Sequence, residues 1–349
     1  MNFAFTDEQA MIADTARAFF SQNATSARTR AAMAADGIDR ALWHSFTAEL
    51  GLGGIALPEA HGGAGLGMVE LAILSEAAGA HVAALPLLGT AMAAQAIAAG
   101  GSQAQKAQWL PGLIAGTSIG APGSSETASV AGNRISGTFD FIPHGASADL
   151  FVLLAGGSVW LVPADAPGLM VVVQTTMDQT RPFARLVLAD TPASPLDSSA
   201  GILRASQAGW LIAAAEALGG AQSCLDLTIA YANQRIQFGR PIGSFQAYKH
   251  RLADMMIEIE QARSAVWWAA CALDEAADDV DIALHSAKSF ATDTFAMCAG
   301  NMIQLHGGIG FTWDHDAHLF FKRSRALQSM LGSNAWHREQ IAQQIGLAA

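Results

Sequence analysis

A block of short β-rich segments lies between two long helical regions, and this order limits the folds that the chain can adopt. Up to about residue 115, apolar residues recur at the spacing of amphipathic helices. From about residue 116 to 190, short β-favouring runs alternate with Gly, Pro, Ser and Thr, which is typical of antiparallel strands. Helical spacing returns near residue 202. Because strands and helices do not alternate, the order argues against a Rossmann fold or a TIM barrel.

The sequence therefore predicts an α+β protein with three segments. We expect an N-terminal helical domain over residues 1–115, a middle antiparallel β domain over 116–200, and a C-terminal helical bundle of four or five long helices over 201–349. The proline- and serine-rich segment 191–199 is expected to be a linker. Expected helices begin after the capping hydroxyl of Thr6 and cover 40–50, 68–79, 88–99 and 102–113, and expected strands cover 139–142, 150–154, 159–162, 169–173 and 185–188.

Composition argues against nucleic-acid binding and predicts that much apolar surface is buried. Lys plus Arg number 19 and Asp plus Glu 30, so the formal net charge is −11. Nucleic-acid binding needs clustered cations, so we expect no general nucleic-acid partner. Only 14% of residues are charged and 51% are apolar, so the chain must bury much surface in its core or against other subunits.

The cysteines, the apolar runs and the first residues of the sequence indicate the cellular compartment. Its three cysteines, Cys224, Cys271 and Cys298, are far apart and form no CxxC pair, which gives no support for a zinc ribbon or a disulfide framework. No apolar run reaches the ~18 residues of a membrane span. The first residues also lack the pattern of an export signal. We expect a cytoplasmic protein without membrane contacts.

Two local motifs carry weak functional signals. The segment 116–120 reads GTSIG and matches the nucleophile elbow of serine hydrolases, with Ser118 as nucleophile. A helix precedes it and a proline follows, whereas the elbow joins a strand to a helix, so a hydrolase is a distant alternative. The segment 314–318 reads DHDAH and could hold a metal ion. Its adjacent carboxylates cannot all converge, and we interpret it as an acidic helix start with no metal.

Cationic residues are concentrated in two places near the C-terminal half. They are Arg235, Arg240, Lys249, His250 and Arg251, followed later by Lys322, Arg323 and Arg325. In an acidic chain such groups can hold a phosphorylated ligand through charge-assisted hydrogen bonds. The alternative is a solvated helix face, and composition alone favours that interpretation.

Two longer motifs resemble those of the acyl-CoA dehydrogenase family. Residues 235–246 read RIQFGRPIGSFQ and residues 304–313 read QLHGGIGFTW. The segment 57–65, LPEAHGGAG, agrees with the N-terminal half of that family. The resemblance covers essentially the whole chain and matches the helical, β, helical order.

The resemblance implies FAD-dependent α,β-dehydrogenation of an acyl-CoA thioester from fatty acid or steroid side-chain degradation. In this chemistry a glutamate removes the α-proton, the β-hydride goes to the flavin, and an electron-transferring flavoprotein reoxidises the flavin. Hydrogen bonds to the thioester oxygen stabilise the enolate. The family shares its FAD sites across a dimer interface, so the resemblance also implies a homo- or hetero-oligomer.

Motif positions carry the family's cofactor contacts onto this chain. Arg235 corresponds to the cation that meets the FAD pyrophosphate of a neighbouring subunit, and Phe238 to a residue that packs nearby. Gln246 corresponds to a contact with the adenosine half. The stretch whose backbone lies against the cofactor corresponds to Gln304, His306, Gly307 and Gly308.

The chain departs from the family at the catalytic base. The two usual base positions correspond to Leu331, before Gly332-Ser333, and to Gly209. Leucine and glycine cannot accept a proton. The nearest carboxylate, Glu216, lies two helical turns from Gly209, about 10 Å along a helix axis. Glu216 is either a relocated base or a structural residue that pairs with an arginine.

The middle domain departs as well. The family's Thr-Glu-Pro-x-Ala-Gly-Ser-Asp segment is replaced by residues 120–126, GAPGSSE. Its Trp-x-Ile-Thr/Ser-Asn segment, whose hydroxyl meets the flavin, is replaced by residues 140–144, DFIPH, where Pro143 offers neither hydroxyl nor N–H.

Two functional interpretations follow. In the first, the chain is an active flavoenzyme with Glu216 as its base. In the second, it is a base-lacking partner subunit that completes a cofactor site together with a competent homologous subunit. Both need the motifs at 235–246 and 304–308. We expect a protein of the acyl-CoA dehydrogenase fold that works within an oligomeric dehydrogenase.

Overall fold

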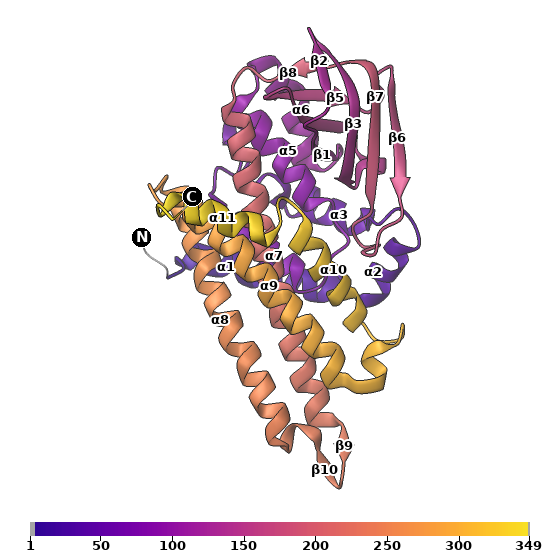
Figure 1. Ribbon diagram of the computed structural model, residues 1–349, viewed down its shortest axis with the longest axis vertical. Coiled ribbons are helices and arrows are strands. Elements are labelled where there is room, and N and C mark those ends of the chain that lie inside the picture. Colours follow the sequence, from indigo (N-terminus) through magenta and orange to yellow (C-terminus); the bar gives the residue numbers. More distant parts are fainter. Residues whose placement is uncertain (1–3, 348–349) are drawn as a thin grey trace. The chain divides into compact units, whose positions relative to one another are not determined.

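The computed structural model describes residues 4–347 (Figure 1). These residues pack into two compact units, which we name the bundle unit and the sheet unit. Among the described residues, the bundle unit contains 4–26, Met68–Ala83 and 210–347, and the sheet unit contains Ala27–Gly67 and Ala84–Gly209. The sequence predicted three domains, divided near residues 115 and 200, according to the order of helices and strands. This division into domains stays a prediction.

Long helices make up the bundle unit. They are α1 (Asp7–Asn23), α4 (Met68–Gly79), α7 (Ala200–Gln234, from Trp210 on), α8 (Gln246–Asp274), α9 (Val280–His306), α10 (Ala317–Ser329) and α11 (Asn334–Gln344). The expected cap of α1 is present: the Thr6 hydroxyl accepts a hydrogen bond from the Gln9 N–H, and the Gln9 side chain bonds back to the Thr6 N–H. This reciprocal pair satisfies two backbone donors at the helix start.

Two adjacent glycines let other helices pack directly against the backbone of α7. A Cβ built on Gly219 would lie 1.9 Å from the carbonyl oxygen of Glu76 on α4. A Cβ on Gly220 would lie 2.4 Å from the ring of Phe295 on α9. No side chain fits at either position, so the two glycines set the distances between these helices.

The sheet unit combines two four-stranded sheets with short helices. One sheet has the order β1-β4-β5-β8 and the other β2-β3-β7-β6. Neighbours are antiparallel except β1 and β4, which run parallel from the Gly120–Leu150 pair. The strands are β1 (Gly120–Ser124), β2 (Ser129–Ala131), β3 (Arg134–Pro143), β4 (Leu150–Ala155), β5 (Ser158–Pro163), β6 (Leu169–Gln174), β7 (Phe183–Pro192) and β8 (Ser194–Pro195). The helices are α2 (Ser26–Met33), α3 (Arg40–His44), α5 (Leu87–Gly100) and α6 (Gln103–Ala115), with single helical turns at η1 (Ser45–Glu49), η2 (Leu52–Gly54), η3 (Glu59–His61) and η4 (Gly145–Ser147).

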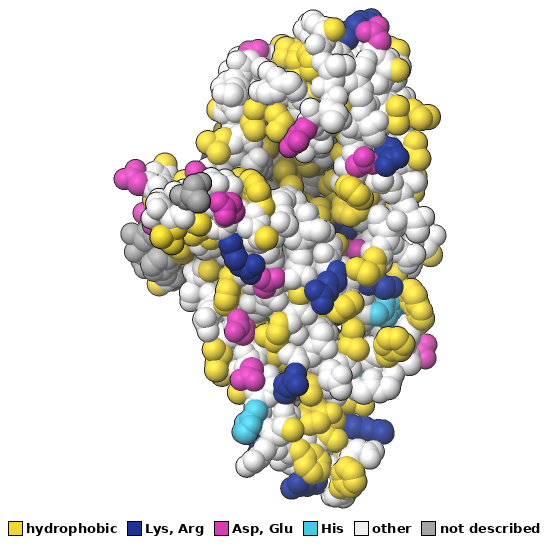
Figure 2. Space-filling view, in the orientation of Figure 1, with side chains coloured by type: hydrophobic (Ala, Val, Ile, Leu, Met, Phe, Trp, Pro, Cys, Tyr) yellow, Lys and Arg dark blue, Asp and Glu magenta, His cyan; other side chains and the backbone are white. Residues whose placement is uncertain are grey.

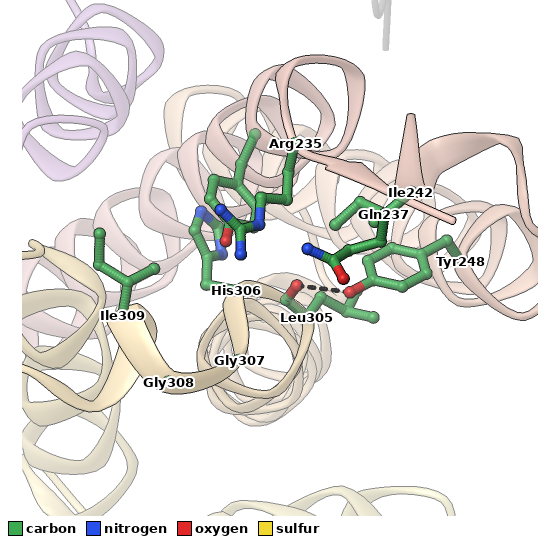
Figure 3. Close-up of a pocket in the computed structure, with 10 residues that line it drawn as sticks. Arg235, Gln237, Ile242, Tyr248, Leu305, His306, Gly307, Gly308 and Ile309 are labelled. Atoms are coloured by element: carbon green, nitrogen blue, oxygen red, sulfur yellow. Dashed lines mark hydrogen bonds between the residues drawn. The ribbon is translucent and has the colours of Figure 1, made fainter. Parts of the chain in front are cut away.

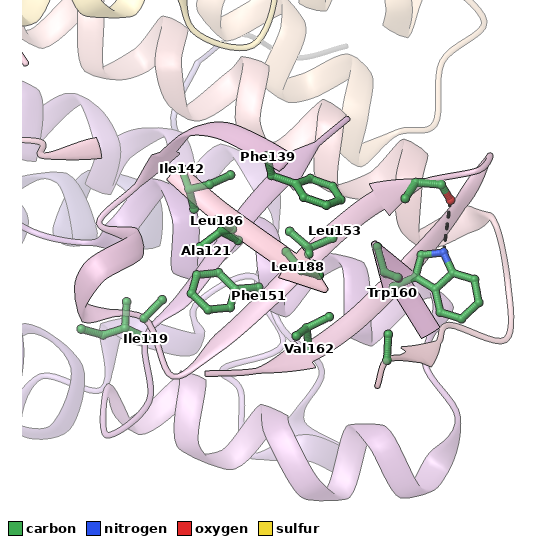
Figure 4. Close-up of a cluster of buried hydrophobic side chains, with 14 of the residues drawn as sticks. Ile119, Ala121, Phe139, Ile142, Phe151, Leu153, Trp160, Val162, Leu186 and Leu188 are labelled. Atoms are coloured by element: carbon green, nitrogen blue, oxygen red, sulfur yellow. Dashed lines mark hydrogen bonds between the residues drawn. The ribbon is translucent and has the colours of Figure 1, made fainter. Parts of the chain in front are cut away.

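Strand β4 is buried on both faces. Phe151 and Leu153 belong to the cluster between the two sheets, where the Trp160 indole N–H donates to the Ala155 carbonyl at 3.1 Å (Figure 4). Leu150 and Val152 belong to a second cluster with side chains of α5 and α6. A strand covered on both sides needs a continuous apolar run, which the sequence supplies over 150–154.

Most expected helices and strands are confirmed. The segment 191–199 is not simply a linker, because β7 extends to Pro192 and β8 pairs Ser194 with Leu161. The expected antiparallel β domain is confirmed, with one exception: β1 and β4 run parallel. Helix α2 and the hairpin of β9 (Ile236–Gln237) and β10 (Arg240–Pro241) were not expected. Among the described residues, no helix is long and apolar enough to cross a membrane.

Candidate functional site

A pocket of about 430 Å³ opens in the bundle unit where the end of α7, the start of α8 and the end of α9 meet (Figure 3). The β9–β10 hairpin and the turn η6 (Gly307–Phe311) complete its rim. Its lining residues are Tyr231, Arg235, Gln237, Ile242, Tyr248, Leu305, His306, Gly307, Gly308 and Ile309. The two motifs of the sequence, nearly 70 residues apart, thus meet in one place.

A tight hairpin presents Arg235 and Gln237 to the pocket. The Ile242 N–H donates to the Arg235 carbonyl at 2.9 Å, and Arg240 pairs with Gln237 across the two strands. The two loop residues between them, Phe238 and Gly239, have φ angles of +51° and +76°. Two left-handed residues in succession are typical of the turn that closes a two-residue hairpin.

The end of α9 forms the opposite wall. The His306 ring stacks on Tyr231 with 4.4 Å between centroids, and its Nδ1 lies 2.7 Å from the Met302 carbonyl oxygen. Burial is the main cause that lowers the pKa of His306 below its usual value, so the ring is neutral near pH 7. Its Nδ1–H donates to Met302, which leaves Nε2 as an acceptor. The helix then stops at Gly307, whose φ of +64° suits glycine.

The start of α8 is fixed to the end of α9 by Tyr248. Its hydroxyl donates to the Leu305 carbonyl at 2.8 Å, as the dashed line in Figure 3 shows. Burial raises the pKa of Tyr248, and the neighbouring Tyr231 adds to the shift. Tyr248 therefore stays a neutral donor across the physiological pH range.

Arg235 is the cation of this pocket. Its guanidinium forms no hydrogen bond or ion pair with any of residues 4–347. The remaining lining combines the Gln237 amide, the neutral His306 ring, and backbone at Gly307 and Gly308, where a Cβ would meet nothing within 4 Å. A free cation beside neutral polar groups and accessible backbone can bind an anionic ligand such as a phosphate.

The structure brings together some of the expected cofactor residues and not others. Arg235, His306, Gly307 and Gly308 line the pocket. Three others, Phe238, Gln246 and Gln304, are exposed and do not line it. Phe238 is 89% exposed at the hairpin tip, where Figure 2 shows hydrophobic and basic side chains gathered at the lower end of the molecule.

Sequence reasoning missed two aromatic residues of the lining. Tyr231 lies in the last turn of α7, four residues before Arg235, whose N–H donates to the Tyr231 carbonyl at 2.9 Å, so both side chains leave this end of the helix on the same side. This spacing could have identified it. Tyr248 lies just beyond the motif that contains Arg235, within the first turn of α8.

Glu216 is not at this pocket. It lies inside the bundle unit with 5% of its surface exposed, and it forms an ion pair with Arg323 of α10, which is 2% exposed. The backbone of Gly79 on α4 also packs closely against Glu216, because a Cβ there would lie 2.1 Å from the Glu216 carbonyl oxygen. The carboxylate thus sits in a tightly packed part of the bundle.

The other base position, Leu331, lies in the turn between α10 and α11. The carbonyl oxygen of Leu331 accepts a hydrogen bond from the indole N–H of Trp210 at 3.0 Å. Trp210 follows Gly209 directly in the chain. The two sequence positions at which the family resemblance expects a base are therefore linked through Trp210, and neither holds a carboxylate.

The segments 116–120 and 314–318 do not have the structural context that a nucleophile elbow or a metal site requires. Ser118 follows α6 and precedes β1, the reverse of the strand-to-helix order of a nucleophile elbow. In the segment 314–318, the His315 ring contacts His306, whereas the His318 ring contacts Trp313. Within residues 4–347, no three His, Cys, Asp or Glu side chains lie where they could share a metal ion.

A buried histidine predicts the acid sensitivity of the bundle unit. Burial, together with the charge of Lys288 and the neighbouring His285, lowers the pKa of His337 from 6.5 to about 3. Below pH 6.5 the unfolded chain therefore binds a proton that the folded protein does not. The linked free energy of unfolding falls by about 2 kcal/mol between neutral pH and pH 5.

This prediction is measured by chemical unfolding between pH 4 and 7.5. His337→Gln keeps an amide N–H for the Leu331 carbonyl but does not titrate, so its stability should change less steeply with pH. Equal slopes for the variant and the wild-type protein would contradict it.

Comparison with known proteins agrees with the two motifs. Residues 6–117 match the N-terminal domain model of acyl-CoA dehydrogenases, and residues 207–346 match the C-terminal domain model. The chain is similar to the acyl-CoA dehydrogenase IpdE2 of Mycobacterium tuberculosis, with 35% identity over 94% of each chain.

Solved structures show the same similarity. A chain of the Tcur3481-Tcur3483 steroid acyl-CoA dehydrogenase superposes with a TM-score of 0.88 at 33% identity, over 97% of this chain and 98% of that one. A chain of the ChsE4-ChsE5 complex of M. tuberculosis superposes with a TM-score of 0.91 at 26% identity, over all of both chains. The chain therefore belongs to the acyl-CoA dehydrogenase family, whose members are FAD-dependent oxidoreductases.

Proposed function

We propose that this chain is one subunit of an FAD-dependent acyl-CoA dehydrogenase and that a homologous partner subunit supplies the catalytic base. One observation carries the proposal. The pocket retains an unpaired Arg235, whereas the two base positions hold Leu331 and Gly209. Such a chain can contribute to a cofactor site but has no obvious group to remove the α-proton of an acyl-CoA.

The pocket lining fits the diphosphate end of FAD. The guanidinium of Arg235 suits a diphosphate because it offers several donors in one plane. The Gln237 amide and the acceptor Nε2 of His306 suit the polar groups beside a diphosphate, and the open backbone at Gly307 leaves room for its oxygens. When bound, FAD supplies the acceptor for the β-hydride of the thioester.

The buried pair of Glu216 and Arg323 argues against a relocated base. A general base must reach its proton and exchange protons during turnover. Glu216 is instead held by a guanidinium within the packed bundle. Proton abstraction would require the pair to break and leave a buried charge without its partner, which is costly.

The similar proteins support a two-chain assembly. Two of the matched structures bear the names of protein pairs, Tcur3481-Tcur3483 and ChsE4-ChsE5, and the first is named a steroid acyl-CoA dehydrogenase. By analogy, the substrate here is an acyl-CoA thioester with a steroid-derived or fatty acyl chain, and an electron-transferring flavoprotein is the electron acceptor.

The test is the visible spectrum of the chain purified alone and after co-expression with a homologue encoded beside it. The proposal expects a colourless chain alone and a yellow complex. One FAD per chain in the protein alone, bleached by acyl-CoA, would instead support a homo-oligomeric enzyme, the alternative with Glu216 as base.

Arg235→Gln provides the matching variant. Because charge-assisted hydrogen bonds to a diphosphate contribute about 1.5–3 kcal/mol, we expect roughly 10- to 100-fold weaker FAD retention by the complex. Titration of the apo-complex with FAD, followed by flavin fluorescence, measures this change. Arg134→Gln is the control, because Arg134 belongs to the sheet unit and pairs with Asp190, and this variant should retain FAD normally. Equal FAD affinity for both variants would contradict a cofactor role for Arg235.

A further inference from the structure

The turn between α10 and α11 has an unusual backbone. Leu331 has a φ of +57° and the following Gly332 a φ of +99°. Glycine adopts such angles readily, but a residue with a side chain does so only when its surroundings hold it there. A strained leucine at this point indicates that the turn, residues 330–333, is held in place by specific contacts.

Donors on three helices bind the carbonyl oxygens of Leu331 and Gly332. The Leu331 oxygen accepts from the Trp210 indole N–H at 3.0 Å and from His337 Nε2 at 3.1 Å. The Gly332 oxygen accepts from Lys288 Nζ at 2.6 Å. The donors come from α7, α11 and α9, so three separate helices fix this turn.

Lys288 makes the most extensive of these connections. Its side chain is fully buried, and Nζ also lies 3.3 Å from the Gln328 carbonyl oxygen and 3.2 Å from Asn334 Oδ1. One amino group therefore joins the end of α10, the turn and the start of α11. A buried lysine is expensive to keep unless its donors are satisfied, and here all three have acceptors.

The acceptor Asn334 is itself held in orientation. The Thr292 hydroxyl donates to Asn334 Oδ1 at 3.0 Å, and the Asn334 amide donates to Asp293 Oδ1 at 2.7 Å. Burial lowers the pKa of Lys288 to about 8, and the Asp293 carboxylate opposes this shift, so the amino group is still mainly charged near pH 7. The lysine thus lies in a prearranged network and not in a chance contact.

The histidine side of the turn has a defined direction of hydrogen bonding. His337 is neutral, and Nε2–H donates to Leu331, so its Nδ1 must accept. The acceptor receives the Nδ1–H of His285 at 2.7 Å. Both rings pack against Trp210 and Trp336, which keeps the pair in place.

We propose that Lys288 is a positioning residue of the acyl-CoA site, because its bond to the Gly332 carbonyl fixes the turn that presents residue 331. The link to acyl-CoA rests on the proposed function, in which residue 331 occupies a base position. Lys288 bonds to the backbone of this turn and not to the substrate. Its effect on the acyl-CoA is therefore indirect: it keeps the turn, and with it the side chain of Leu331, in one position.

The first measurement follows the Trp210 indole N–H by NMR in protein labelled with ¹⁵N-tryptophan. In Lys288→Met, a buried side chain of similar length loses its donors, and we expect exchange of this N–H with solvent to become at least 10-fold faster. The indoles of Trp43 and Trp160 donate to backbone carbonyls in the sheet unit and should keep their rates. Faster exchange at all three would indicate general unfolding and overturn the proposal.

Thr294→Val is the matched control on the same helix. Thr294 is buried on α9, and its hydroxyl has no hydrogen-bond partner within the described chain. The variant removes a hydroxyl without breaking a bond, so the Trp210 rate should not change. Unchanged exchange in Lys288→Met as well would overturn the proposal.

The second measurement is dehydrogenation by the co-expressed complex. We expect Lys288→Met to lower kcat/KM for acyl-CoA by at least 10-fold at unchanged FAD content, and Thr294→Val to leave it unchanged. Faster Trp210 exchange with normal kcat/KM would show that the turn does not serve the site and would overturn the proposal. If the wild-type complex lacks FAD and activity, the proposed function fails, whereas the exchange measurement still decides whether Lys288 fixes the turn.

A milder variant covers the case in which Lys288→Met does not fold. Asn334→Ala removes one acceptor of Lys288 and keeps its bond to Gly332. We expect an intermediate, two- to five-fold acceleration of Trp210 exchange and a smaller decrease in kcat/KM. No change in either quantity would overturn the proposal.

Discussion

Replacing Arg323 with methionine should lower the free energy of unfolding by about 3–5 kcal/mol, because removal of one partner leaves a buried charge uncompensated. Arg323 and Glu216 are 2% and 5% exposed and form an ion pair between α10 and α7. Methionine fills much of the arginine volume, so the loss arises mainly from the stranded carboxylate. Urea unfolding at pH 7, followed by far-UV circular dichroism, measures the change.

Two further variants separate charge from packing. Adding Glu216→Gln to Arg323→Met removes the stranded charge and should recover much of the lost stability. Arg17→Met breaks the pair with Asp14, in which both side chains are largely exposed, and should cost less than about 1 kcal/mol. A similar small loss for Arg323→Met would mean that Glu216 is not dependent on this pair. Glu216 would then be available again as a candidate base.

The second large effect is expected at the packing of α7 against α4. Gly219→Ala should lower the free energy of unfolding by about 1–3 kcal/mol or more, because inserting atoms into a packed core usually costs this much. The added Cβ would lie 1.9 Å from the Glu76 carbonyl oxygen, and a backbone atom cannot move aside as a flexible side chain does. The two helices must separate, which also loosens the contacts of the neighbouring Gly220.

Gly300→Ala is the matched control for this prediction. Gly300 also lies within a helix, α9, but a Cβ there would meet nothing within 4 Å. Alanine favours helix over glycine by about 0.8–1 kcal/mol, so this variant should be more stable than the wild-type protein. Thermal unfolding of both variants gives the comparison. Stabilisation by both would contradict the close packing of α7 on α4.

Local sequence signals predicted the elements that carry strong patterns. The expected helix over 68–79 coincides with α4, and the capping hydroxyl of Thr6 begins α1. The β9–β10 hairpin has two-residue strands, too short to show any alternation. Strand β8 is equally short, and Pro195 within it suggested a linker. Its pairing with β5 depends on tertiary contacts that no local pattern reports.

The candidate site was predicted in part for a similar reason. The motifs identified Arg235 and His306, and their family positions implied a shared cofactor. The sequence raised an arginine partner for Glu216 but could not identify Arg323, because the two residues lie 107 positions apart. The network around Lys288 was not predicted at all, since its members come from separate helices and no motif contains them.

Strands β4 and β5 have a consequence for how the sheet unit unfolds. Alternate side chains of both strands enter the cluster between the sheets, and the others enter the cluster beneath α5 and α6. The two clusters therefore lie on opposite faces of the same pair of strands, and only the thickness of one strand separates them. If either α5 and α6 or the sheet β2-β3-β7-β6 detached, one apolar face of β4 and β5 would be exposed to water. The sheet unit should therefore unfold in a single cooperative transition, and a destabilising substitution in either cluster should also destabilise the other.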